Sequence, residues 1–163
     1  MDRQKENPIK NGLMLFLIAV IYVVAFPFLF PGILKGISLR FKFLKVALTQ
    51  GKFIVFVYSN SPNWKSYIEE KINPQIQDHA ILLNWSERGQ WDKHDWAVKA
   101  FHHWGGRKNF NPLAIVFCNI FDVRVIRFYI AFHGYKHGNV VALQKAEAQL
   151  YDLIKARTLR KST

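Results

Sequence analysis

Residues 53–58 read FIVFVY, a run of β-branched and aromatic side chains that predicts a strand buried on both faces. Similar runs at residues 79–85 (HAILLNW) and 112–118 (PLAIVFC) predict two further strands, and residues 123–132 predict a fourth. The short turn before this fourth strand makes the last two strands a hairpin. Helical patterns separate the first three strands, so the first half of the domain predicts parallel strands joined by crossovers.

Local signals place the helices between these strands. Ser61-Pro62 predicts the start of the first helix, with serine as the N-cap, and Asn73-Pro74 predicts its end. Asp92 is expected to cap a second helix that ends at Gly105-Gly106. Gly138-Asn139 is expected to begin a last helix that continues to about residue 156. The predicted class is therefore α/β, with the order β-α-β-α-β-β-α.

This order resembles the thioredoxin fold over residues 52–157. In that family a proline directly precedes the third strand and forms a cis peptide near the active site, and Asn111-Pro112 stands at that place. The family's redox cysteines lie between the first strand and first helix, where this chain has residues 59–64 (SNSPNW). Because no thiol lies there, the resemblance implies a redox-inactive binding or scaffold domain and not a dithiol oxidoreductase.

An uncharged segment precedes the domain. Residues 12–34 carry no charged side chain, and a helix of this length would match a hydrocarbon core of about 30 Å. A cleaved signal peptide is the alternative, but its apolar region would be about 7–15 residues long with small residues at the cleavage site. The segment therefore predicts a single-pass transmembrane helix, and the excess of Lys and Arg after it predicts a cytoplasmic C-terminal domain.

The basic residues are concentrated outside the predicted domain core. The net charge is +12, and residues 35–52 contain five Lys or Arg and no acidic residue. Four more Lys or Arg lie in residues 155–161. This placement favours a lipid bilayer with anionic headgroups as a partner and argues against nucleic acid, which would favour a basic face on the folded domain itself.

The segment between anchor and domain supports two secondary structures. Ile37, Phe41, Leu44 and Leu48 recur at helical spacing, but apolar and polar residues also alternate as in a strand. We expect an amphipathic helix ended by Gly51. The expected divisions are an N-terminal tail (1–11), a transmembrane helix (12–34), a basic juxtamembrane segment (35–51), the thioredoxin-like domain (52–157) and a basic tail (158–163).

The resemblance implies that three loops, residues 59–64, 85–91 and 107–109, converge at one end of the sheet, where we expect a binding surface. Open α/β sheets tend to bind ligands at the carboxyl ends of their strands, and aromatic and arginine side chains often anchor interfaces. Helix capping by serine and a solvated tryptophan loop are the plainer alternatives. The candidate binding residues are Ser61, Trp85, Glu87, Arg88, Trp91, Arg107 and Pro112.

An enzyme is the alternative function. It would use His102, His103 or His133 with Glu87 or Asp95 as an acid–base site. Metal binding is disfavoured because residues 133–137 (HGYKH) contain glycine and resemble a loop, and no cofactor motif is present. Cys118 is expected to be an inert strand residue. The preferred hypothesis is a membrane-anchored, redox-inactive thioredoxin-like module that binds a protein partner or a small ligand.

Overall fold

The computed structural model describes residues 8–107 and 110–159, and the chain forms two compact units, residues 1–38 and 39–163. Helix α1 (Pro8–Gln50) is 43 residues long and contributes to both units. The predicted domain boundary at residue 52 therefore lies too late, because the last turns of α1 belong to the second unit.

The predicted membrane-spanning helix is wrong. In the part of the chain that the structure describes, no helix is both long enough and apolar enough to cross a membrane. Residues 12–34 do not form a separate apolar helix ended by its prolines, because α1 continues into the stretch that carries Lys35, Arg40 and Lys42. The single-pass membrane location and the cytoplasmic placement of the C-terminal domain depended on that helix and are withdrawn with it.

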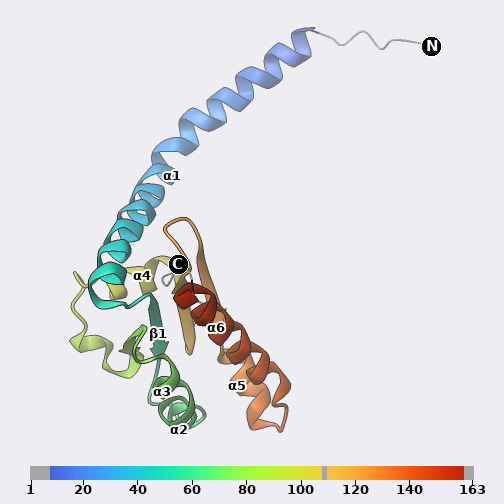
Figure 1. Ribbon diagram of the computed structural model, residues 1–163. Helices are drawn as coiled ribbons and strands as arrows, with labels where there is room; N and C mark the ends of the chain where they lie inside the picture. Colours follow the sequence, from blue (N-terminus) through green and yellow to red (C-terminus); the bar gives the residue numbers. More distant parts are fainter. Residues whose placement is uncertain (1–7, 108–109, 160–163) are drawn as a thin grey trace. The chain divides into compact units, whose positions relative to one another are not determined.

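The second unit is built on a four-stranded sheet with the strand order β2-β1-β3-β4 (Figure 1). Strand β1 (Ile54–Tyr58) pairs in parallel with β2 (Ala80–Asn84) and antiparallel with β3 (Leu113–Phe117). Strand β4 (Val123–Arg127) pairs antiparallel with β3 and forms the far edge. The sheet thus has the four expected strands, and all residues of β1 and β3 are buried as their apolar runs predict.

Aromatic side chains cover both faces of this sheet. Phe56 of β1 meets Phe128 edge-on, with 5.8 Å between ring centroids. Phe117 of β3 points to the opposite face, because Phe56 pairs with Ala114 and side chains alternate along a strand. There it stacks on Phe43 of α1 at 4.5 Å and contacts two tryptophans of α4.

The first helical segment does not stop at Asn73-Pro74. It consists of α2 (Lys65–Tyr67), a π-helical turn η1 (Ile68–Ile72) and α3 (Asn73–Ile76), and Figure 1 shows these elements in green. The wider turn places Pro74 in the first turn of α3, where its missing N–H is tolerated. Pro74 therefore lies in the first turn of a new helical segment, and the helical region continues past it.

The second helix begins later than predicted. A short 3₁₀ helix η2 (Trp85–Gln90) follows β2, and α4 spans Trp96–Trp104. The cap is Asp95, whose carboxylate accepts a hydrogen bond from the Ala97 backbone N–H at 2.6 Å. Asp92 instead accepts from the His94 backbone N–H at 2.7 Å, within the turn that precedes α4.

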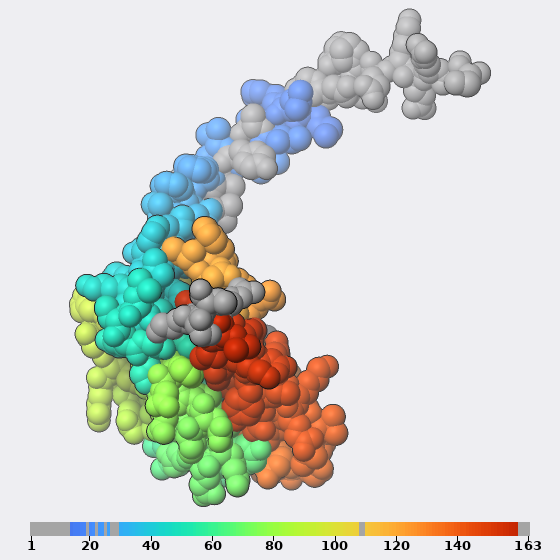
Figure 2. All heavy atoms as spheres, viewed as in Figure 1, coloured from blue at the N-terminus to red at the C-terminus, as the bar shows by residue number. Residues whose placement is uncertain are grey.

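The predicted fourth strand is too long. β4 ends at Arg127, and α5 (Tyr129–Lys136) follows, so the segment expected to be a loop is helical. Helix α6 (Val141–Leu159) then completes the unit, and the side chain of Asn139 accepts from the Val141 backbone N–H at 3.2 Å. Helices α5 and α6 lie side by side, shown in orange and red in Figures 1 and 2.

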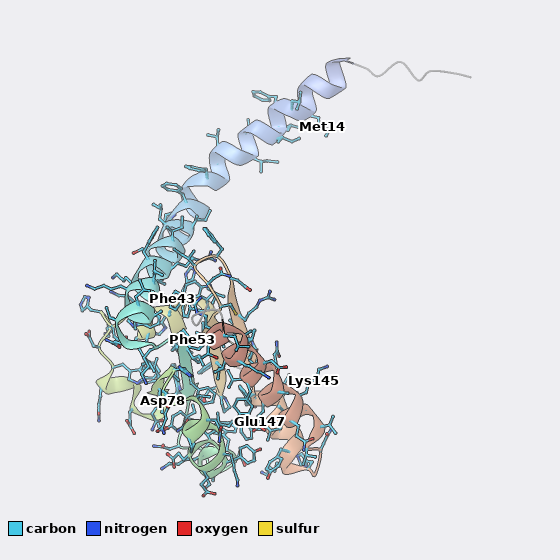
Figure 3. The ribbon with its side chains drawn as sticks, in the orientation of Figure 1. Met14, Phe43, Phe53, Asp78, Lys145 and Glu147 are labelled. Carbon is cyan, nitrogen blue, oxygen red and sulfur yellow. The ribbon has the colours of Figure 1, made fainter. Side chains whose placement is uncertain are left out.

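The final turns of α1 are amphipathic, but the buried stripe is not the predicted one. Leu39, Phe43 and Ala47 are buried in the second unit, and Figure 3 labels Phe43 at this position. Phe41 and Leu48 of the predicted stripe are 61% and 71% exposed. Gly51 follows the helix with φ of 69°, which agrees with the predicted terminating role.

This assignment predicts different effects for two phenylalanines two positions apart. Phe43→Ala should lower the free energy of unfolding by about 3–5 kcal/mol, because it removes a buried ring from the stack on Phe117. Phe41→Ala is the matched control and should change it by less than about 0.5 kcal/mol, because that ring is exposed. Urea denaturation of the whole chain measures both values, and equal losses would show that the buried stripe is wrongly assigned.

Candidate functional site

Two of the three predicted loops meet at the carboxyl ends of β1 and β2. The Asn84 side-chain amide donates to Asn60 Oδ1 at 3.0 Å and to Glu87 Oε1 at 2.8 Å. Asn84 Oδ1 accepts from the Ser86 backbone N–H at 3.1 Å, and Ser86 Oγ accepts from the Asn60 backbone N–H at 3.0 Å. One asparagine thus links the end of β1 to η2 and caps that short helix.

An aromatic cluster packs around Trp85, the first residue of η2. Trp85 lies 5.6 Å from Trp91, 5.5 Å from Phe101 and 4.7 Å from Phe110, measured between ring centroids, and all three contacts are edge-on. Phe110 follows the third predicted loop, so this cluster brings the residue next to that loop to the same end of the sheet. Edge-to-face contacts of this kind add about 0.5–1.5 kcal/mol each beyond the area that they bury.

The predicted site residues do not all serve the same purpose. The Arg88 guanidinium lies over the Trp85 ring, 5.0 Å from its centroid, and donates to the Trp85 carbonyl at 3.3 Å. Arg88 therefore stabilises η2. Pro112 is buried, follows a cis peptide bond and accepts from the Phe128 backbone N–H at 2.9 Å, so it belongs to the core.

Ser61 and Arg107 are also separate from the cluster. The first helix begins at Lys65 with Trp64 as its N-cap residue and without a side-chain cap bond. Ser61 Oγ accepts from the Asn63 backbone N–H at 3.4 Å, which is a turn contact. Arg107 is exposed and lies at the edge of residues 108–109, which are outside the described residues.

A groove of about 470 Å³ lies beside β2 and η2 and contains two of the predicted residues, Glu87 and Trp91. Its other lining residues come from β1, from the turn after β1, from α2 and η1, and from β2. The full lining is Tyr58, Asn60, Lys65, Glu69, Leu82, Leu83, Asn84, Glu87, Gln90 and Trp91. Sequence analysis missed most of these residues, because residues such as Tyr58, Leu82 and Gln90 belong to no motif that marks a site.

The groove presents uncharged hydrogen-bonding groups and few charges. Lys65 Nζ and Glu69 Oε1 are 4.0 Å apart, so this pair is largely self-compensated. Burial raises the pKa of the Tyr58 hydroxyl, and the neighbouring Glu69 carboxylate raises it further. Tyr58 is therefore a neutral hydroxyl that can donate or accept a hydrogen bond.

The alternative catalytic residues are not assembled into a site. The Asp95 carboxylate caps α4, and Glu87 accepts from Asn84. His133 and His137 do come together, with ring centroids 5.2 Å apart, because α5 is a helix where a loop was expected. Within residues 8–107 and 110–159, no three His, Cys, Asp or Glu side chains are placed to hold a metal ion.

Comparison with known proteins supplies no further identification. The chain matches no protein-family model, no curated protein and no solved structure. Its function therefore has to be argued from the groove and from the strand beside it.

A hydrogen bond between Tyr67 of α2 and Glu147 of α6 predicts how the stability of the protein depends on pH. Burial and a hydrogen bond to Glu147 of α6 raise the pKa of Tyr67 to about 12. The unfolded chain ionises this hydroxyl near the ordinary tyrosine pKa of 10.0, so stability should fall as the pH rises from 10 towards 12. Below pH 10 this contribution is fully present.

Tyr67→Phe tests that contribution. It should cost about 1.5–3 kcal/mol at neutral pH, because it removes a hydrogen bond to a carboxylate. Between pH 10 and 12, the variant should lose less stability with rising pH than the unsubstituted chain in urea denaturation. Parallel pH profiles would contradict the assignment. Tyr129→Phe serves as the control, because Tyr129 is exposed and is not among the groups that raise the pKa of Tyr67.

Proposed function

We propose that this protein is a redox-inactive, thioredoxin-like binding module that recognises an extended segment of a partner protein by adding it as a strand along β2. The observation that carries the proposal is the open outer edge of β2 beside the groove. The strand order β2-β1-β3-β4, with β2 parallel and β3 antiparallel to β1, supports the thioredoxin-like part.

The direction of the β2 backbone groups follows from its pairing with β1. The Ile54 backbone N–H donates to the His79 carbonyl at 3.0 Å, and Ile54 is the register partner of Ala80. In a parallel ladder this geometry directs the backbone of Ile81 and Leu83 at β1. Ala80 and Leu82 therefore direct their N–H and C=O groups outward, and none of the described residues bonds to them.

The two edges of the sheet differ in side-chain charge. The outer strand β4 reads VRVIR and carries exposed Arg124 and Arg127. Charged side chains on an edge strand discourage pairing with another chain. β2 reads AILLN, without a charge or a proline, and its Leu82 is 37% exposed. Only the β2 edge is thus suited to accept a further strand.

The groove supplies selectivity to backbone pairing. In strand addition, main-chain hydrogen bonds give affinity and pockets beside the edge read the added side chains. Leu82 and Trp91 offer apolar contact, and Asn60, Asn84 and Gln90 offer amide groups. We expect the partner segment to be uncharged or weakly basic, because the lining has two carboxylates and one lysine.

The proposal can be tested with linear peptides selected against the whole chain from a random display library. Leu82→Pro removes an outward N–H and leaves the bonds of β2 to β1 in place, as proline permits on an edge strand. This variant should weaken binding of the selected peptides at least tenfold, which corresponds to about 1.4 kcal/mol, in fluorescence anisotropy.

Leu82→Ala is the matched control for that experiment. It removes the same apolar contact but keeps the backbone donor, so it should weaken binding clearly less than Leu82→Pro does. Unchanged binding by the folded Leu82→Pro variant would refute strand addition, and so would a library that yields no binding peptide. Circular dichroism establishes that both variants are folded.

A further inference from the structure

A second cavity, separate from the groove, lies between the turn before α2 and helix α5. Its volume is about 230 Å³, and it is lined by Asn63, Trp64, Tyr129, Phe132, His133, Lys136 and His137. This is smaller than the roughly 300–1,000 Å³ of pockets that hold drug-sized molecules. The size therefore favours a small ligand.

The walls of this cavity are aromatic and fixed in place. The Trp64 ring lies 6.2 Å from Tyr129, edge-on, and 6.2 Å from Phe132, which is fully buried. The indole Nε1 donates to the Oγ of Ser59, a buried residue, at 3.2 Å. This bond holds the Trp64 ring, so an apolar surface is already formed before any ligand arrives.

The rim of the cavity is basic. His133, Lys136 and His137 follow one another at helical spacing on α5 and at its end, so their side chains lie on one side of that helix. All three are exposed, and the cavity lining contains no Asp or Glu. An anion at this rim would meet one ammonium group and two imidazoles without a compensating carboxylate.

We propose that this cavity binds a small organic anion, with a flat apolar body against Trp64 and Tyr129 and a carboxylate or phosphate group against His133, Lys136 and His137. The proposal does not depend on strand addition at β2. The cavity is lined by residues of α5, and no residue of α5 lines the groove.

Isothermal titration calorimetry of the whole chain at low salt tests the proposal with four probes. These are benzoate, phenyl phosphate, benzyl alcohol and inorganic phosphate, each with EDTA present so that no metal bridges the imidazoles and the anion. Benzoate or phenyl phosphate should bind at least tenfold more tightly than benzyl alcohol, and the stronger of the two identifies the anionic group. Inorganic phosphate should bind more weakly than phenyl phosphate because it lacks the apolar body.

Two substitutions that each remove one positive charge test whether the anion binds in this cavity. Lys136→Gln should weaken the preferred anion about tenfold, because it removes the ammonium group at the rim. Lys145→Gln, at an exposed position on α6 labelled in Figure 3, should leave the affinity unchanged. Equal binding of benzyl alcohol, no binding of either aromatic anion, or equal effects of the two substitutions would each overturn the proposal.

Discussion

The stack of Phe43 on Phe117 is the contact on which the second unit depends. It joins the last turns of α1 to the central strand β3, with 4.5 Å between ring centroids. Trp96 and Trp104 of α4 meet the same Phe117 ring at 5.6 and 5.2 Å. One strand residue thus organises two helices that are far apart in sequence. Aromatic side chains bury about 150–250 Å² each, so a few of them are enough to cover this face of the sheet.

The strands were predictable from the sequence because burial on both faces leaves a simple signal. β1 and β3 are short, continuous apolar runs rich in β-branched and aromatic residues, which favours a strand over a helix. The predicted extension of the fourth strand through residue 132 was wrong, because a short apolar run can also belong to a helix. Residues 128–132 (FYIAF) have strand-like composition, but Phe128, the N-cap residue of α5, and Phe132 of α5 are one helical turn apart and both are buried. Packing there outweighs β propensity.

The errors in the helices have local causes. Two aspartates precede α4, and each accepts a backbone hydrogen bond, so composition alone could not separate the cap at Asp95 from the turn at Asp92. In α1 two apolar stripes share the last turns, and only the tertiary contact with Phe117 selects the stripe that contains Phe43. The apolar stretch of residues 12–34 was expected to be a helix separate from the basic segment after it, whereas α1 is continuous through both.

For the candidate site, sequence reasoning placed seven residues on one surface, and the structure gives them different roles. Trp91 and Glu87 line the groove, whereas Arg88 stabilises η2 and Pro112 is a core residue. The structurally central residue, Asn84, closes the second strand and gave no recognisable motif. The pairing of His133 and His137 was dismissed because glycine suggested a loop, although a single glycine within a helix costs only about 1 kcal/mol relative to alanine.

The unequal edges of the sheet also limit how the protein can assemble. A sheet that accepts strands at both edges can grow without end, which is the geometry of fibrous aggregates. Here the β4 edge carries Arg124 and Arg127, so among the described strands only the β2 edge is free of charge. Under the strand-addition proposal, this asymmetry favours complexes of defined size over open-ended polymers.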